Sequence, residues 1–311
     1  MINCIFQDIF INTEIKKYKI DKILNQKNNI IELNIISELE KRVLPEGLKI
    51  LKISGNNSIF KIEKGILPEG LEILEIDGDN TISKIDKEVL PKGLKILKID
   101  GFNTISSLES DVLPESLETL EISGDNSISE IKKYVLPESL KCLYIYGYNS
   151  ISEIEKDVLP KGLKVLKICG QNTISKIERG ILPEGLKKLK IYGFNKISKI
   201  EKGVLPKGLK KLKISGINTI SKIEGGVLPE GLKYIEIDGM NTIFEIKKGV
   251  LPESLKYIEI NGMNISFTVK KVLLNGYEDL KIYGRNIIIN INKEGFLKNF
   301  KTLEVSVDNH I

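Results

Sequence analysis

The sequence predicts a β-rich solenoid, a single array of about twelve coils of 23 residues with a parallel sheet along one face. All ten prolines recur at intervals of 23 residues, from Pro45 to Pro252, and a Gly-x-Asn motif follows with the same period. Leu and Ile repeat at fixed positions between these markers. A fixed period of this size is typical of repeat architectures. It is too short for a helix–turn–helix unit, which needs about 34 residues, but it accommodates a strand, a turn and a return path.

The strand of each coil is expected in the pattern Leu-x-x-Leu-x-Ile, as in residues 71–76. Side chains alternate along its second half, so Leu74 and Ile76 face the core whereas Ile73 and Glu75 face solvent. Equivalent residues of successive coils then stack about 4.8 Å apart. The repeat therefore predicts a long parallel sheet on the concave face.

The Gly-x-Asn motif follows each strand. A recurring glycine indicates a positive φ or close packing against the next coil. An asparagine inside a turn can bond the backbone groups that a sheet leaves unpaired. We therefore predict a structural asparagine ladder, made of Asn57, Asn80, Asn103, Asn126, Asn149, Asn172, Asn195, Asn218, Asn241 and Asn264.

The return path carries apolar residues at spacings of three and four, as in Ile82, Ile85 and Val89. This spacing predicts short 3₁₀ or extended segments on the convex face. The proline that follows ends the segment and favours extended backbone before it.

The chain divides into three predicted regions: an N-terminal cap with a degenerate repeat (1–44), ten regular repeats (45–274) and degenerate C-terminal capping repeats (275–311). In the first region, Ile30-x-x-Leu33-x-Ile35 is similar to a degenerate strand. In the last, residues 300–305 keep the strand pattern although the proline is lost. A solenoid must protect its exposed ends, which gives both regions a structural role.

The Leu-Pro-x-[Gly/Ser]-Leu opening and the segment Leu-x-x-Leu-x-Ile-x-Gly-x-Asn-x-Ile resemble the LPxxL subclass of leucine-rich repeats. Coils with Phe before the Asn, such as Phe102-Asn103 and Phe194-Asn195, are most similar to FNIP repeats, which are abundant in amoebae and in the giant DNA viruses that infect them. The FNIP unit is usually one residue shorter, and the Pro after its Asn is absent here. The resemblance covers about residues 45–309 and implies the fold and a viral or amoebal protein rather than a particular function.

The same resemblance raises a role as substrate receptor of a ubiquitin-ligase complex, because some FNIP-repeat proteins carry an N-terminal F-box. Residues 1–44 lack the Leu-Pro start and the Trp that an F-box would show. A cap is therefore the favoured interpretation, and the receptor role stays an alternative.

The composition favours a non-enzymatic scaffold. The only histidine is His310, so we expect no His-dependent catalysis, no cofactor and no metal site. The net charge of +5 is too small to indicate nucleic acid. Three cysteines do not make a disulfide framework. Because no apolar run approaches the roughly 20 residues of a membrane span and no signal sequence is evident, we expect a monomeric, soluble protein of the host or producing cell's cytoplasm.

The outward strand positions vary while the core positions do not, so recognition is expected there. Lys52, Glu75, Lys98 and Glu121 alternate in sign and should pair across strands. A cluster in the middle of the array is the predicted partner-binding site: Tyr144, Tyr146, Lys164, Lys167, Lys187, Lys188, Lys190, Tyr192, Lys210, Lys211 and Lys213. Stacked like charges cost stability, which indicates a functional reason, here capture of a protein with an acidic surface.

Other interpretations of this cluster remain open. It could be solvated surface enriched in lysine, or it could bind a polyanion. Glu236, Asp238 and Glu259 follow it and predict an acidic border. The residues between Gly and Asn are either an exposed apolar ridge or packed against the next coil; they are Phe102, Tyr148, Phe194, Ile217, Met240 and Met263.

Overall fold

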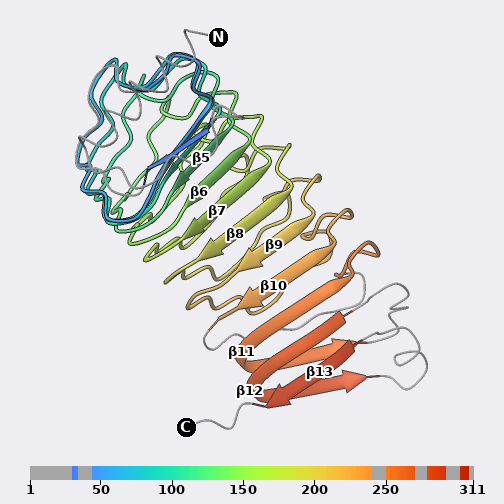
Figure 1. Cartoon of the computed structure of the whole chain (residues 1–311). Coiled ribbons are helices and arrows are strands. Elements are labelled where there is room, and N and C mark those ends of the chain that lie inside the picture. The colour runs from blue at the N-terminus through green and yellow to red at the C-terminus, as the bar shows by residue number, and fades with distance from the viewer. Residues whose placement is uncertain (1–29, 34–43, 240–249, 270–278, 292–301, 308–311) are drawn as a thin grey trace. The chain divides into compact units, whose positions relative to one another are not determined.

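The computed structural model describes residues 30–33, 44–239, 250–269, 279–291 and 302–307, which Figure 1 shows in colour. These residues form 13 strands in parallel arrangement, ordered as in the sequence, and none of them is helical. The chain divides into two compact units, Met1–Asn149 and Ser150–Ile311. The predicted parallel-strand solenoid of 23-residue coils is confirmed.

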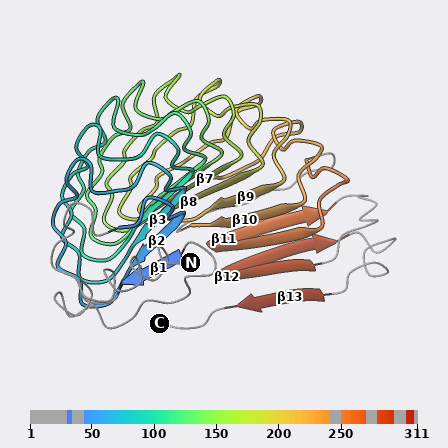
Figure 2. The same cartoon turned by 45° about the horizontal axis from the view of Figure 1, so that its top comes forward.

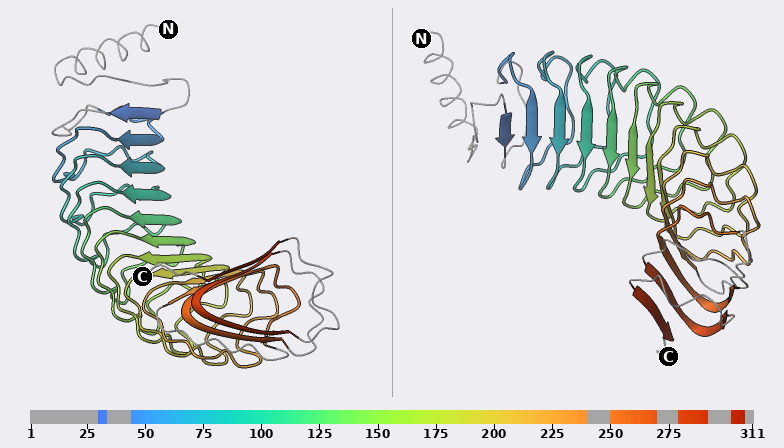
Figure 3. Two further views of the ribbon diagram at one scale, coloured as in Figure 1. Left: turned by 90° about the horizontal axis from the view of Figure 1, so that it is seen from below. Right: turned by 90° about the vertical axis from the view of Figure 1, so that its right-hand side faces the viewer.

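The first unit contains six strands: β1 (Ile30–Leu33), β2 (Ile50–Ile53), β3 (Ile73–Ile76), β4 (Ile96–Ile99), β5 (Thr119–Ile122) and β6 (Cys142–Ile145). From β2 to β6 each strand pairs with the next in a register of 23 residues, as in Leu51 with Leu74 and Leu74 with Leu97, whereas β1 pairs with β2 in a register of 20, as in Ile31 with Leu51. Buried and partly exposed residues alternate along every strand, as the sequence pattern predicts. Figures 2 and 3 show the strands of this unit side by side.

The second unit contains seven strands: β7 (Val165–Cys169), β8 (Lys188–Tyr192), β9 (Lys211–Ile214), β10 (Tyr234–Asp238), β11 (Tyr257–Val269), β12 (Asp279–Ile291) and β13 (Thr302–Val307). Two of them, β11 and β12, are 13 residues long and continue through Gly262 and Gly284, where the regular coils turn. They curve along their length (Figure 3). The apolar run 287–291, which has no counterpart in the regular coils, pairs with residues 265–269.

The core is built from the same few positions in every coil. Leu71, Leu74 and Ile76 are at most 1% exposed, and so are their equivalents in neighbouring coils. Complete burial of one such side chain stabilises the fold by about 1.5–3 kcal/mol. Each coil buries these residues against its neighbours, so the coils stabilise one another rather than folding alone.

The return segments, for which the sequence allows 3₁₀ or extended backbone, are mainly extended. In the part of the chain that the structure describes, no 3₁₀ turn is assigned, and the segments are extended and irregular. Their backbone groups bond to the preceding coil: the N–H of Thr81 donates to Ile59 (2.8 Å) and that of Thr104 to Ile82 (2.9 Å). The extended alternative therefore holds along most of each segment, and local bonds between residues three apart occur at its end, as from the N–H of Val204 to Glu201 (3.2 Å).

A tight turn ends each return segment, and one of its residues has a positive φ. Glycine occupies the position in some coils, as at Gly65 (78°) and Gly180 (82°). In four successive coils a residue with a side chain stands there instead: Glu88 (61°), Asp111 (62°), Tyr134 (65°) and Asp157 (62°). This left-handed conformation costs an L-residue about 1–2 kcal/mol.

The ends of the array lie largely outside the described residues, including most of 1–44, Asn309 and His310, so the capping roles stay predictions. The N-terminal strand is present but shifted. Ile31 and Leu33 are its buried residues and lie opposite Leu51 and Ile53, whereas the sequence pattern aligned Leu33 and Ile35 with that pair. A two-residue shift keeps the same faces buried, because the side-chain period of a strand is two.

Candidate protein-binding face

The asparagine ladder lies inside the fold. Eight of the predicted side chains, from Asn57 to Asn218, are 0% exposed; those of Asn241 and Asn264 lie outside the described residues. The Nδ2 of Asn195 donates to the carbonyl oxygen of Ser215 (3.0 Å) and that of Asn218 to Asp238 (3.1 Å), each twenty residues onward in the next coil. Asn57, Asn80, Asn103, Asn126 and Asn172 donate to the equivalent carbonyls. These amides link successive coils and are inaccessible to a ligand.

The glycine before each asparagine lies close to the backbone of the preceding coil. Gly78 and Gly124 have φ values of 80° and 79°. A Cβ on Gly78 would overlap the carbonyl oxygen of Gly55, and a Cβ on Gly124 would overlap that of Gly101. In the second unit the equivalent glycines have larger φ values, 143° at Gly193 and 147° at Gly216.

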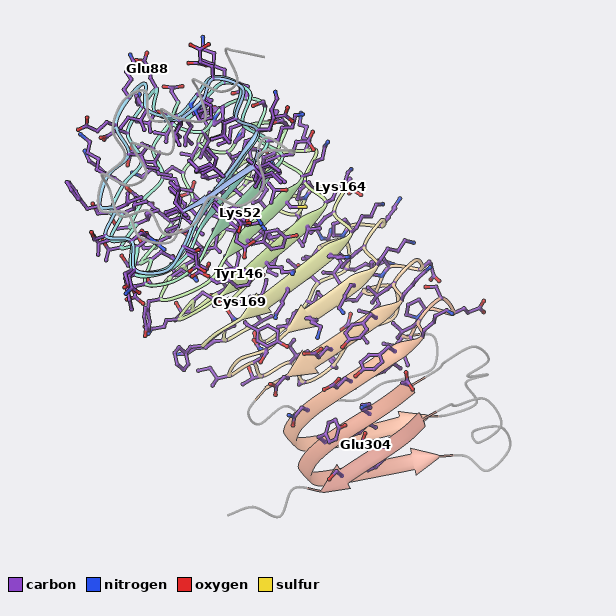
Figure 4. The ribbon with its side chains drawn as sticks, in the orientation of Figure 1. Lys52, Glu88, Tyr146, Lys164, Cys169 and Glu304 are labelled. Atoms are coloured by element: carbon purple, nitrogen blue, oxygen red, sulfur yellow. The ribbon has the colours of Figure 1, made fainter. Side chains whose placement is uncertain are left out.

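On the strand face of the first unit, meaning the outward side chains of β1–β6, the charges pair with one another. Lys52 and Lys98 lie 3.1 and 2.8 Å from Glu75, which stands between them; Figure 4 labels Lys52. Burial raises the pKa of Glu75, but its bonds with Lys98 and Lys52 outweigh burial and hold the pKa below its ordinary value. The predicted alternation is confirmed for these three residues, and their charge is satisfied within the fold.

The predicted partner-binding cluster is divided between the two units. Tyr144 and Tyr146 belong to the first, and their rings stack with centroids 6.3 Å apart. Burial, followed by a hydrogen bond with Cys142, raises the pKa of Tyr144 to about 12. The nine other predicted residues all belong to the second unit.

Three of these lysines lie against turns. A Cβ built on Gly185 would lie 2.8 Å from the Nζ of Lys164, and the same relation joins Gly208 to Lys187 (2.7 Å) and Gly231 to Lys210 (2.5 Å).

Coils with serine at this glycine position fill the space with a hydroxyl. The Oγ of Ser116 donates to Leu94 (2.7 Å), and that of Ser139 donates to Leu117 (2.7 Å). The structure therefore places Lys164, Lys187 and Lys210 at the turn end of the strands, a distinction that the sequence pattern did not reveal.

The other lysines form rows on the strand face of the second unit, meaning the outward side chains of β7–β13. Lys167, Lys190 and Lys213 lie opposite one another on successive strands, and Lys188 lies opposite Lys211. On β8, Lys188 and Lys190 point outward while Leu189 and Ile191 are buried. We name Lys188 and Lys190 the β8 lysine pair. Among the described residues, no carboxylate lies within ion-pair distance of either.

A network around Glu236 borders these rows. Lys213 forms an ion pair with Glu236, and the hydroxyls of Tyr192 and Tyr234 both donate to it, the latter at 2.8 Å. The Glu236 side chain is only 12% exposed. Burial raises its pKa, but the bonds from Lys213, Tyr192 and Tyr234 outweigh burial and hold the pKa below its ordinary value.

The predicted acidic border is therefore engaged inside the fold. Besides the Glu236 network, Asp238 accepts a hydrogen bond from Ser215 (2.9 Å). Tyr257 donates to Glu259, and burial, followed by this bond, raises the pKa of Tyr257 to about 12. None of the three carboxylates stands alone on the face.

Two tyrosines of this network were not among the predicted site residues. Tyr234 and Tyr257 stack with centroids 4.2 Å apart and planes 5° from parallel. The Nζ of Lys211 lies 3.9 Å from the Tyr234 ring centroid, and the Nζ of Lys190 lies 4.3 Å from that of Tyr192. The signal in the sequence was two tyrosines one period apart at the first outward strand position.

The residues between Gly and Asn form no continuous ridge. Phe102, Tyr148 and Phe194 are 55%, 57% and 56% exposed, while Ile217 is partly buried. Polar residues such as Asp125 alternate with the aromatic ones. Met240 and the side chain of Met263 lie outside the described residues. The exposed interpretation holds for the three aromatic residues, which are isolated from one another along the sequence.

Other candidate chemistry is sparse. Cys142 and Cys169 are reduced thiols and partly buried, and burial raises the pKa of the Cys169 thiol. Within the described ranges, no group of three His, Cys, Asp or Glu side chains could hold a metal ion. No helix able to cross a bilayer occurs there either.

Structures of known proteins share this fold. CroV588, described as a circular LRR protein, has a TM-score of 0.65 and 23% identity, over 89% of this chain and 43% of its own. YopM from Yersinia enterocolitica WA-314 has a TM-score of 0.59 and 24% identity, over 89% of this chain and 60% of its own. A chain of the octameric complex of latrophilin 3, Unc5D and FLRT2 (LRR) has a TM-score of 0.62 and 19% identity, over 85% of this chain and 83% of its own. The chain thus spans less than two thirds of the first two proteins.

The repeat itself matches a known family. None of the curated proteins compared with the chain matches it. The family model described as FNIP Repeat matches residues 37–79, 57–102, 80–125, 126–171, 172–216 and 221–262. These matches span more than half of the chain and coincide with the coils of the structure. The protein therefore belongs to the FNIP-repeat family, and it shares its fold with structures of leucine-rich-repeat proteins.

Proposed function

We propose that this protein is a non-enzymatic scaffold whose strand face in the second unit binds a protein partner with an acidic surface. The observation that carries the proposal is the β8 lysine pair. These two ammonium groups share one outward face, and no described carboxylate pairs with either. On the strand face of the first unit, by contrast, Lys52 and Lys98 share Glu75.

The lysine row on β7, β8 and β9 has an energetic cost. Like charges directly opposite each other on neighbouring strands destabilise a sheet, and Lys167, Lys190 and Lys213 form such a row. Lys213 of this row is paired with Glu236, whereas an acidic partner would neutralise the charge of the β8 lysine pair and be steered by it. Proteins of this fold are found in protein complexes, as the FLRT2 complex illustrates for that protein.

Affinity capture with charge variants tests the proposal. The chain is immobilised as wild type, as Lys188→Glu/Lys190→Glu, and as the control Lys196→Glu/Lys207→Glu, which changes the net charge equally at exposed residues outside the strands. We expect a protein that wild type and control retain and that the β8 variant loses. The same proteins on all three columns would contradict the proposal. So would a partner that proves to be nucleic acid, which its loss after nuclease treatment would reveal.

A further inference from the structure

We propose that the strand face receives an extended acidic segment of its partner, lying along β8, with carboxylates at alternate residues. This inference rests on the proposed function and specifies the shape of what is bound. It depends on three features of the second unit: the spacing of the β8 lysine pair, the engagement of the lysines beside it, and the fixed position of the border.

The spacing comes from the strand. Lys188 and Lys190 are separated by the buried Leu189, so both point to the same side of β8. Two residues along a strand span about 6.6 Å. An extended peptide repeats its own side chains on one face at the same distance, whereas adjacent acidic residues would point to opposite faces.

The two lysines of the neighbouring strand β9 are already engaged by side chains of β10. On β9, Lys213 is bound to Glu236, and Lys211 lies over the ring of Tyr234. Their ammonium groups are already directed toward β10. Lys190 also lies over a ring, that of Tyr192 on its own strand, but no described carboxylate meets either lysine of the β8 pair.

The acidic border around Glu236 is held in place by hydrogen bonds and stacked rings. The Tyr192 hydroxyl donates across to Glu236, and Tyr234 and Tyr257 stack beyond it. Lys211, opposite Lys188, lies over the Tyr234 ring and is thereby directed toward the border. Its pKa is lowered by burial first and then by Lys213, which fits a face with an excess of positive charge.

A pair of isomeric peptides tests the alternation. Both are twelve-residue fluorescein-labelled peptides of four aspartates and eight threonines. In one the aspartates alternate with threonine, and in the other they stand at every third position, so that no two of them lie two residues apart on one face. Fluorescence anisotropy with the full chain should give an affinity about fivefold higher for the alternating peptide. Lys188→Glu/Lys190→Glu should abolish that preference, and Lys196→Glu/Lys207→Glu should keep it.

The outcomes separate this inference from the proposed function. Equal binding of both peptides, lost in the β8 variant, would overturn the alternation while leaving the acidic-partner proposal intact. Binding of neither peptide, or equal loss in both charge variants, would contradict both proposals. Tighter binding of a twelve-nucleotide single-stranded DNA than of either peptide would overturn the inference in favour of nucleic acid.

Discussion

At the scale of single residues, adjacent asparagines show how position in the coil decides the role of a side chain. Asn57 is fully buried and donates to the carbonyl of Asp77, whereas Asn56 is exposed. Replacing Asn57 with Ala leaves that carbonyl without its partner inside the fold, which costs about 1–3 kcal/mol. We expect Asn57→Ala to lower the free energy of unfolding in urea by this amount and Asn56→Ala to change it by less than about 0.5 kcal/mol. Equal effects would mean that the ladder does not hold the coils together.

Tyr134 offers a second test at this scale, because it holds a left-handed conformation with its side chain 89% exposed. The equivalent Gly180 adopts a similar φ without a Cβ. Tyr134→Gly should therefore be more stable than Tyr134→Ala by about 1 kcal/mol, since alanine keeps the steric cost and glycine removes it. Thermal unfolding of the two variants measures the difference. An alanine variant as stable as the glycine variant would contradict the assigned strain.

At the scale of elements, the Glu236 network joins β8, β9 and β10 through one carboxylate. Its pKa is held below the ordinary value of 4.5 in the folded chain. Such a group contributes stability above the pKa of the unfolded chain, and that contribution is lost as the pH falls through the pKa of the folded chain. Glu236→Gln should thus cost about 1–3 kcal/mol at pH 7, and the difference from wild type should shrink at pH 3.

Urea unfolding at the two pH values measures this difference, with the exposed Glu184→Gln as control in the same unit. The control should differ little from wild type at pH 7. A Glu236→Gln penalty that is as large at pH 3 as at pH 7 would show that the carboxylate charge is not what holds the network.

The turn before each strand can be improved where it lacks a hydroxyl. Ser116 bonds the carbonyls of Lys92 and Leu94 in the preceding coil, while Gly93 occupies the same position one coil earlier. A Cβ on Gly93 would meet only the carbonyl oxygen of Glu69, at 3.6 Å, so a serine fits. Gly93→Ser should exceed Gly93→Ala in unfolding free energy by about 0.5–1.5 kcal/mol, the net contribution of a hydrogen bond. Equal stability of the two variants in urea would argue against that bond.

The strands could be predicted well from the alternation of apolar and polar residues. The alternation of Leu74 and Ile76 with Ile73 and Glu75 located the strand and its buried face, because a half-buried strand must alternate. The return segments were harder. Spacings of three and four in Ile82 and Ile85 are shared by short helices and by extended segments, and hydrogen bonds to the preceding coil, which the spacing does not encode, decided between them.

The candidate site was predictable in composition but not in geometry. Lys164 and Lys167 look alike in the sequence, yet one lies beside a turn and the other on the strand face. The difference depends on where β7 begins, because Lys164 precedes its first residue and Lys167 lies within it. Likewise, the sequence predicts Glu236 as part of an acidic border, but three donors surround it, one each from β8, β9 and its own strand β10.

At the scale of the whole molecule, the array uses one set of positions for stability and another for recognition. Buried Leu, Ile and Asn repeat in every coil, so their contribution grows with the number of coils. The outward strand positions are free to differ without disturbing that core. They pair their charges around Glu72 and Glu75 in the first unit, and they leave the β8 lysine pair without a described carboxylate in the second.

Lysine footprinting of the partner-bound protein tests the central claim most directly. The chain is acetylated briefly with and without its captured partner, and the modification of each lysine is measured by mass spectrometry. The account predicts that Lys188 and Lys190 are protected by the partner, whereas Lys196 and Lys207, also in the second unit, react equally in both samples. Unchanged acetylation of the β8 lysine pair in the complex, with protection elsewhere on the chain, would contradict it.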